Sequence, residues 1–276
     1  MEPQSDMVAV CEKAAARMRR NILKLAFMAG KKGTHLGGCL SVVEILATLW
    51  CSVLRIKQDE PLWPDRDRFI LSKGHASLAL YTAMEAAGTI SEEQLLTFGK
   101  NGGPLSTASS LVPGLGLEFS NGSLGLGLPY GIGLALAAKR LQKPHHIYVL
   151  MGDGECNEGS VWEAAMAAIH YQLSNLTVIV DYNRMQSDGK CSDIMNVQLT
   201  GMWKGFGWNV IVVEDGHSPG HLCTAFTQAR QGTTPVALIA HTVKGKGISF
   251  MEHNSKWHHG FLSAEEYDLA LKELTR

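Results

Sequence analysis

Short apolar runs that alternate with helical segments constrain the fold of this chain more than any other feature. Runs rich in valine and isoleucine occupy residues 145–152, 176–183, 208–216 and 235–243. The segments between them have the 3.6-residue periodicity of amphipathic helices, and a further apolar run at 69–71 precedes an alanine-rich helical segment. Strands that alternate with helices at this length form parallel sheets covered on both faces. We therefore predict an α/β fold, a parallel sheet with helices on both faces.

The length of the chain fits one large domain. With 276 residues, of which 45% are apolar, the chain can bury a sizeable core. No internal repeat or linker is visible, so we predict a single domain over residues 1–276, with an irregular C-terminal tail from about residue 248. The other predicted elements are helices at 7–29, 42–54, 125–140, 158–171, 198–206 and 219–231, a short capped helix within 91–99, and loops at 31–41 and 100–124. Glycines at 127, 131 and 133 would let the helix at 125–140 pack closely on another helix.

Charge and hydropathy limit the kinds of partner and the cellular location that we expect for the chain. The formal net charge of -1 gives no reason to expect binding to nucleic acid or to an anionic membrane. Charges or glycines interrupt every apolar run well before twenty residues, so we expect no membrane-spanning helix. The N-terminus lacks a basic start followed by an apolar core, which argues against a secretory signal. Six cysteines without CxxC or metal-ligand spacing favour free thiols, and we predict a cytoplasmic protein.

Two polar side chains fall at the ends of neighbouring predicted strands. Asp153 stands between Gly152 and Gly154 directly after one strand, and Asn183 ends the next. Parallel strands bind ligands at their carboxyl ends, and the helix that begins near Glu158 presents an N-terminus that favours phosphate. A carboxylate, an amide oxygen and a backbone carbonyl make a hard oxygen site that suits Mg²⁺ or Ca²⁺ with a diphosphate. Taken alone, the Gly-Asp-Gly triplet is also compatible with an ordinary turn.

Several ordered segments resemble the transketolase family. Gly-Asp-Gly followed thirty residues later by asparagine resembles the thiamine diphosphate motif, and GDGE, EGSVWEAAMAA and LTVIVDYN resemble transketolases specifically. The segments RDRFILSKGHAS, NGSLGLGL, AHTVKGKGISFME and WHHG follow in the family's order, so the resemblance extends over nearly the whole chain. It implies a thiamine diphosphate-binding (PP-type) domain, thiamine diphosphate with Mg²⁺ (or Ca²⁺) as cofactors, and a small sugar or keto substrate.

Carried over residue by residue, the resemblance also implies roles for individual side chains. The metal ligands are the side chains of Asp153 and Asn183 and the carbonyl of Met185. The catalytic residues are His35, His75, His258 and Glu158, of which the glutamate links two active sites at a subunit interface. His259 is an alternative to its neighbour. The cofactor-binding residues are His75, Gly122, Leu124, Gly152, Asp153, Gly154, Glu155, Asn183 and His258.

Other residues receive structural interpretations. The histidines left as surface or core residues are His145, His146, His170, His217 and His221. Lys244 and Lys246 lie either near the diphosphate or in a solvated basic loop. Trp162 and Met166, at helical spacing, are predicted to be core residues.

One part of the active site that the resemblance implies has no counterpart among these residues. Thiamine diphosphate chemistry needs a glutamate hydrogen-bonded to the cofactor's pyrimidine. In the family this glutamate comes from a separate pyrimidine-binding domain, and a third domain follows it. Because nothing in residues 1–276 stands in for these parts, we expect the diphosphate-binding subunit of a split, two-component transketolase, inactive alone. Its partner would be a second subunit that carries the pyrimidine-binding and C-terminal domains, in an α₂β₂ assembly.

One departure from the family concerns the substrate. The family has a Gly-His-Pro segment whose histidine contacts the donor's hydroxyketone, but this chain has no histidine between His75 and His145. Residues 106–110 are small instead, and losing one buried hydrogen bond costs about 1–3 kcal/mol. We therefore predict a donor or acceptor that differs from the usual pentose and hexose phosphates.

Three alternatives remain open at this point. One is another thiamine diphosphate-dependent enzyme that makes or breaks C–C bonds, such as a decarboxylating synthase. A second is the α-subunit of a 2-oxo acid dehydrogenase. A third, from a different class, is a catalytically silent homologue with an interaction or regulatory role, against which the intact Asp153, Asn183, His35 and His75 argue.

Overall fold

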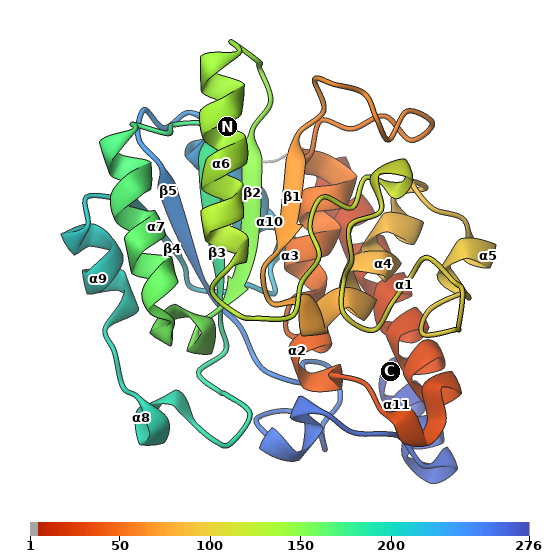
Figure 1. Ribbon diagram of the computed structural model, residues 1–276. Coiled ribbons are helices and arrows are strands. Elements are labelled where there is room, and N and C mark those ends of the chain that lie inside the picture. The colour runs from red at the N-terminus through yellow and green to blue at the C-terminus, as the bar shows by residue number, and fades with distance from the viewer. Residues whose placement is uncertain (1–4, 276) are drawn as a thin grey trace.

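Five parallel strands organise the computed structural model, which describes residues 5–275 (Figure 1). They are β1 Arg68–Leu71, β2 Ile147–Gly152, β3 Leu176–Tyr182, β4 Asn209–Val213 and β5 Val236–His241. The strand order is β1-β2-β3-β5-β4, and every neighbouring pair is parallel. The predicted α/β class with a parallel sheet is therefore confirmed.

Helices cover both faces of this sheet (Figure 1). On one face lie α1 Ser5–Ala29, α3 Val43–Thr48, α4 Ser77–Ala86 and α10 Pro219–Arg230. On the other lie α6 Gly127–Arg140, α7 Gly159–His170 and α9 Leu199–Gly205. Successive residues of β2 divide between the two cores, with Leu150 in the first and Val149 in the second. Because both faces are buried, the strands read as continuous apolar runs rather than as alternating ones.

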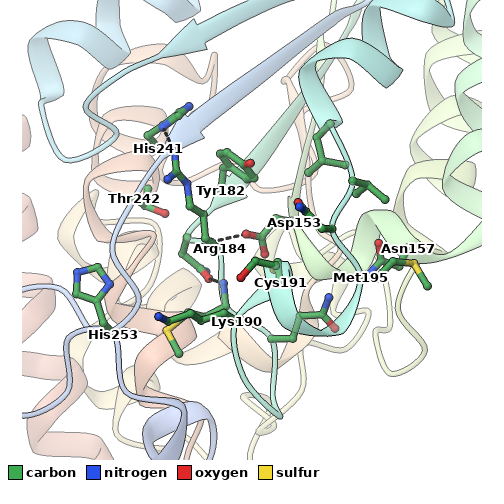
Figure 2. A pocket seen from close by; sticks show the side chains of 17 residues that line it. Asp153, Asn157, Tyr182, Arg184, Lys190, Cys191, Met195, His241, Thr242 and His253 are labelled. Atoms are coloured by element: carbon green, nitrogen blue, oxygen red, sulfur yellow. Dashed lines mark hydrogen bonds between the residues drawn. The ribbon is translucent and has the colours of Figure 1, made fainter.

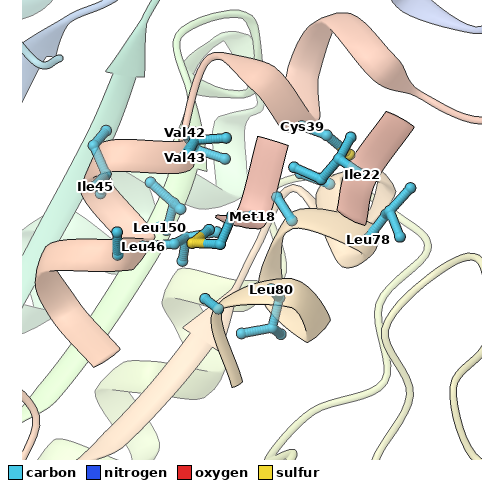
Figure 3. Close-up of a cluster of buried hydrophobic side chains, with 14 of the residues drawn as sticks. Met18, Ile22, Cys39, Val42, Val43, Ile45, Leu46, Leu78, Leu80 and Leu150 are labelled. Atoms are coloured by element: carbon cyan, nitrogen blue, oxygen red, sulfur yellow. The ribbon is translucent and has the colours of Figure 1, made fainter. Parts of the chain in front are cut away.

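The larger core joins α1, α3 and α4 to the sheet. Figure 3 shows Met18 and Ile22 from α1 meeting Leu46 from α3, Leu78 from α4 and Leu150 from β2. These side chains are at most 1% exposed. Each contributes about 1.5–3 kcal/mol through burial, which fixes the position of the loop between α1 and α3.

Several predicted elements need correction. The tail from about residue 248 is not irregular throughout, because α11 spans Ala264–Glu273 and is capped by a reciprocal Ser263–Glu266 box. The loop predicted at 31–41 contains the short helix α2, Leu36–Leu40. The helix predicted at 42–54 ends as an α-helix at Thr48 and continues as one π-turn, Leu49–Val53. Two further short helices are α5 Glu92–Leu95, whose predicted cap is confirmed, and α8 Cys191–Ile194.

The structure also tests the predictions about Trp162, Met166 and the glycines of α6. Met166 is 52% exposed, so its interpretation as a core residue is wrong, whereas Trp162 is half-buried. The glycines of α6 do not pack on another helix. A Cβ on Gly131 would lie 2.7 Å from Cγ2 of Val149 in the sheet, and Gly133 faces open space.

The N-terminal prediction is only partly covered by the structure. The first four residues of the segment that argued against a secretory signal lie outside the described residues. Across residues 5–275, no helix is both long and apolar enough to cross a bilayer. The single-domain organisation stays a prediction.

Candidate functional site

Asp153 and Asn183 meet at the carboxyl edge of the sheet, as their positions after β2 and β3 predict. Oδ2 of Asp153 accepts a hydrogen bond of 2.5 Å from the backbone N–H of Arg184, the residue after Asn183. The side chain of Asn183 donates to Asp181 at 2.8 Å and accepts from the N–H of Met185 at 3.0 Å. The three predicted metal ligands therefore belong to one small cluster of backbone turns.

The carboxylate of Asp153 is buried, with 4% of the residue exposed. Its hydrogen-bond donors in this turn are the backbone amides of Gly154 and Arg184. Burial, with the nearby charge of Asp181 adding to it, raises the pKa of Asp153 to about 6. The site thus holds a carboxylate whose negative charge is poorly compensated. Residues 5–275 contain no cluster of three or more His, Cys, Asp or Glu side chains that could hold a metal ion, so an ion here would depend on mixed carboxylate, amide and carbonyl oxygens.

A cavity of about 540 Å³ opens beside this edge (Figure 2). The segment that follows β3 and includes α8 lines much of it, and the end of β5 lines another part. Figure 2 shows Asp153, Cys191 and Arg184 around the cavity, with His241 and His253 on the β5 side. The cavity therefore gives a small anionic or polar ligand access to Asp153.

Histidines from distant parts of the chain gather next to this edge. The ring centroid of His35 lies 5.2 Å from that of His75, 5.3 Å from that of His258 and 4.6 Å from that of His259. Backbone hydrogen bonds between Thr34 and Gly260, at 2.8 and 3.0 Å, join the two loops that carry three of these rings. The structure therefore brings the three predicted catalytic histidines together.

The choice between His258 and His259 is informed by their surroundings. The ring of His258 also lies 5.5 Å from that of His75, and its Nδ1 is 3.0 Å from Nζ of Lys244. His259 is exposed and packs on Gly33 at the outer side of the cluster. These contacts favour His258 as the residue that faces the site.

The predicted catalytic histidines are neutral at pH 7. Burial lowers the pKa of His75 to about 2, and the nearby Lys73 adds to the effect. Burial likewise lowers the pKa of His35 and of His258 to about 4, with Lys244 contributing to both. A neutral imidazole has one donor and one acceptor nitrogen, so each ring can both give and take a hydrogen bond.

Lys244 is buried rather than solvated. It is 2% exposed, and its Nζ donates to the carbonyl of Gln186 at 3.0 Å besides approaching His258. Burial, with the charge of Lys73 adding to it, lowers the pKa of Lys244 to about 8. The side chain of Lys246, by contrast, is 39% exposed and lies 3.6 Å from Glu252. The solvated-loop interpretation therefore holds for Lys246 and is wrong for Lys244.

A buried ion pair that the sequence interpretation missed lies beneath the site. Nζ of Lys73 is 2.6 Å from Oδ2 of Asp181 and donates to the carbonyl of Gly38 at 2.9 Å. Ser41 donates to the same carboxylate at 2.7 Å, and Thr242 also donates to it. The signal was available, because Asp181 is a charge inside an apolar strand and buried charges are paired. The pair connects β3, the segment after β1 and the loop that contains His35.

The loop that contains Gly122 lies against the segment that contains His75. A Cβ on Gly74 would be 2.1 Å from Cβ of Asn121, so only glycine permits this approach. Glu155 is buried and accepts hydrogen bonds from the N–H groups of Gly125 at 2.8 Å and Gly152 at 3.2 Å. Its carboxylate therefore braces this loop against the end of β2.

The remaining predicted residues lie around the same loop. Leu124 is half-buried, and Gly122 and Glu158 are exposed. A Cβ on Gly125 would be 2.6 Å from Cβ of Glu158, which places this glutamate beside the loop at the surface. The structure thus leaves Glu158 open to a neighbouring molecule.

The small residues 106–110, which are expected to stand in place of a Gly-His-Pro segment, lie against the segment that contains His75. The carbonyl of Gly74 accepts a hydrogen bond of 3.4 Å from the N–H of Ser109. Ser77 donates to the carbonyl of Thr107 at 2.7 Å, and Tyr81 donates to that of Ser106 at 3.1 Å. Residues 106, 107 and 109 therefore pack against Tyr81, Ser77 and Gly74, in the segment that contains His75.

Comparisons with known proteins agree with this geometry. Residues 11–275 match the family model described as "Transketolase, thiamine diphosphate binding domain". The chain is 40% identical over 270 residues to one subunit of the apulose-4-phosphate transketolase of Phocaeicola vulgatus, covering 97% of this chain and 95% of that protein. It is 38% identical over 250 residues to 6-deoxy-6-sulfo-D-fructose transketolase subunit SqwG of a Clostridium species, covering 90% of each. The solved structure of transketolase from Leishmania mexicana superposes with a TM-score of 0.89 at 28% identity, over 96% of this chain but 41% of that one.

Proposed function

The chain belongs to the transketolase family, and we propose that it is the thiamine diphosphate-binding subunit of a two-component transketolase. In this proposal it transfers a two-carbon ketol unit from a ketose donor to an aldehyde acceptor, together with a second subunit. The observation that carries the proposal is a pair of opposite, poorly compensated buried charges at one sheet edge, Asp153 and Lys244. A metal ion and a diphosphate would compensate the two charges at the same time.

The metal proposed for this site is Mg²⁺ (or Ca²⁺), held by Asp153, Asn183 and the carbonyl of Met185. An all-oxygen donor set suits either hard cation. The raised pKa of Asp153 supports the fit, because a bound cation would stabilise the buried carboxylate.

The diphosphate is proposed to lie between this metal and Lys244. The lysine donates to an uncharged carbonyl and approaches an uncharged imidazole. A buried cation is costly unless an anion compensates it, so the phosphates would offset this cost. Gly154, next to the proposed metal ligand, is the glycine at which the backbone would approach them.

The neutral histidines supply proton transfer and orientation in this proposal. Thiamine diphosphate, when bound, supplies the carbanion-stabilising chemistry of ketol transfer. His75 and His258 would face the cofactor, and His35 would exchange hydrogen bonds with the hydroxyl groups of the substrate. Because the rings lie 5.2–5.5 Å apart, one small substrate could contact more than one of them.

The proposed partner is a second subunit that carries the pyrimidine-binding and C-terminal domains, in an α₂β₂ assembly. The names of the two relatives above, each of which specifies one subunit of a transketolase, support a division into subunits. An exposed stripe on α6 without charged side chains supports a protein interface there. It consists of Leu126, which is 46% exposed, Tyr130, which is 38% exposed, and the exposed Gly133 and Ala137. Glu158 stands exposed near the start of this stripe.

The substrate is proposed to be a ketose other than the common pentose and hexose phosphates. The small residues at 106–110 support this, since they remove a polar partner for the donor next to His75. The names of the relatives, which specify apulose-4-phosphate and 6-deoxy-6-sulfo-D-fructose, also support an unusual ketose. Efficient turnover of xylulose 5-phosphate by the assembled enzyme would contradict this part of the proposal.

The alternative thiamine diphosphate enzymes are not favoured, because the relatives named above are transketolases along nearly the whole chain. A silent homologue is distinguished by cofactor binding. Calorimetry of the chain with its partner should give saturable thiamine diphosphate binding that requires Mg²⁺ or Ca²⁺ and is weakened by Asp153→Asn. Binding that ignores both the metal and the substitution would contradict the proposed site. The cytoplasmic location stays a prediction.

A further inference from the structure

His217, which has no role in the site described above, connects two distant parts of the chain. It lies in the turn between β4 and α10, and its Nε2 accepts a hydrogen bond of 2.9 Å from the backbone N–H of Val243. Its Nδ1 is 2.9 Å from Oε2 of Glu44 in α3. Because a backbone N–H can only donate, Nε2 carries no proton and Nδ1–H donates to the glutamate. Both ring nitrogens are therefore used, and the tautomer is fixed.

The partner of His217 is itself held firmly. Arg19 in α1 binds both carboxylate oxygens of Glu44, one of them at 2.8 Å. Despite burial, the contacts with His217 and Arg19 lower the pKa of Glu44 to about 2, so it stays ionised. Nε of Arg19 also donates to the carbonyl of Lys246 at 3.3 Å. The charged groups that face His217 are thus Glu44 and Arg19, together with Asp215 of its own turn, whose carboxylate accepts from the backbone N–H of His217 at 2.9 Å.

These contacts hold the segment 243–246 on either side of Lys244. His217 binds the residue before this lysine, and Arg19 binds the carbonyl two residues after it. Between them, the N–H of Gly245 donates to the carbonyl of Gly37 at 3.0 Å. The side chain of Lys244 leaves this segment towards Gln186 and His258. A displacement of Val243 would therefore move the lysine in the site.

We propose that His217 is a positioning residue for Lys244, acting through its hydrogen bond to the N–H of Val243. The inference rests on the proposed function, in which Lys244 faces the diphosphate of the cofactor. The turn after β4 that contains His217 would then influence cofactor affinity, although it contributes no residue to the proposed diphosphate site.

Two substitutions separate the two bonds of the ring. Gln can place an oxygen near the position of Nε2 and keep the acceptor for Val243, whereas Asn can place an N–H near Nδ1 and keep only the donor to Glu44. We expect His217→Asn to weaken thiamine diphosphate binding by about fivefold and His217→Gln to change it by less than about twofold. Calorimetry on the complex with its partner and Mg²⁺ measures both dissociation constants.

A double substitution tests whether the effect passes through Lys244. In a Lys244→Met background, His217→Asn should cause no further loss of affinity, because coupled residues are not additive. Additive losses would overturn the inference, and so would equal losses for His217→Asn and His217→Gln or no loss for His217→Asn. Should His217→Asn fail to fold, His217→Ser, which keeps neither bond, carries the same expectation.

Two controls separate positioning from a loss of stability. His221→Asn changes an exposed histidine in the helix that follows the turn and should leave affinity unchanged. Ile132→Val, in the core on the other face of the sheet, lowers stability without touching the segment 243–246 and should also leave affinity unchanged.

If the unsubstituted complex binds no thiamine diphosphate, the proposed function itself is overturned. If it binds and His217→Asn binds equally well, only the present inference fails.

Discussion

The buried pair formed by Lys73 and Asp181 allows a quantitative test of how the site is built. Lys73→Met keeps the length of the side chain and removes its charge. Lys73 is 2% exposed and Asp181 is 0% exposed, so solvent screens their interaction little. Removing one partner of such a pair leaves an uncompensated charge and costs about 3–5 kcal/mol. This is a large part of the roughly 5–15 kcal/mol that typically stabilises a domain.

The partner substitution should recover most of this loss. In Asp181→Asn, the carbonyl oxygen can still accept from Ser41 or Thr242, and no negative charge remains. We expect the double variant Lys73→Met/Asp181→Asn to be more stable than Lys73→Met alone by at least about 2 kcal/mol. Urea unfolding of the four proteins at pH 7.5, followed by far-UV circular dichroism, gives the free energy of unfolding of each.

Two outcomes of these four unfolding measurements would contradict the importance of the ion pair. A loss below about 1 kcal/mol for Lys73→Met would mean that the pair behaves like an exposed one. Strictly additive losses would mean that Lys73 and Asp181 do not interact in the folded protein. Either result would remove the ion pair as the support of the loop that contains His35.

Further predictions concern the metal, the histidines and the proposed interface. Asp153→Asn should raise the dissociation constant of thiamine diphosphate at least about tenfold by calorimetry, and chelation with EDTA should abolish the difference from the unsubstituted protein. The pKa of His75 is about 2 in the folded protein, below the value of about 6.5 in the unfolded chain. The unfolded chain therefore binds more protons between these two values, and stability falls as the pH falls through 6.5. Between pH 7.5 and pH 5.5 this residue should lower the free energy of unfolding by about 1.4 kcal/mol. The variant His75→Asn should therefore lose about 1.4 kcal/mol less over the same pH range in urea unfolding. A pH dependence equal to that of the unsubstituted protein would contradict the low pKa. Tyr130→Asp should weaken assembly with the partner in analytical ultracentrifugation, whereas Lys139→Asp on the last turn of α6 should not; equal effects would argue against the apolar stripe as the interface.

The fold class was predictable because both faces of the sheet are buried. Apolar strands such as 176–182 leave few alternatives once helical segments separate them, and parallel pairing then puts Asp153 beside the turn after Asn183. The meeting of those two residues followed from strand order alone.

One missed feature had a local signal, whereas others depend on long-range contacts. The tail was predicted to be irregular, yet the Ser263–Glu266 cap that begins α11 is a local signal that could have been recognised. The charge of Asp181 inside an apolar strand indicated that a partner exists, but no local pattern identifies Lys73, 108 positions away, as that partner. The burial of Lys244 and the contacts of His217 likewise arise only when the segments after β4 and β5 meet.

Reconstitution of ketol transfer tests the central claim most directly. The purified chain, thiamine diphosphate and Mg²⁺ are assayed with a ketose donor and an aldehyde acceptor, alone and after assembly with the polypeptide encoded beside it. Our account predicts no turnover by the chain alone and turnover by the assembled pair, which Asp153→Asn should reduce. Turnover by the chain alone, at a rate that the second polypeptide does not increase, would contradict the account.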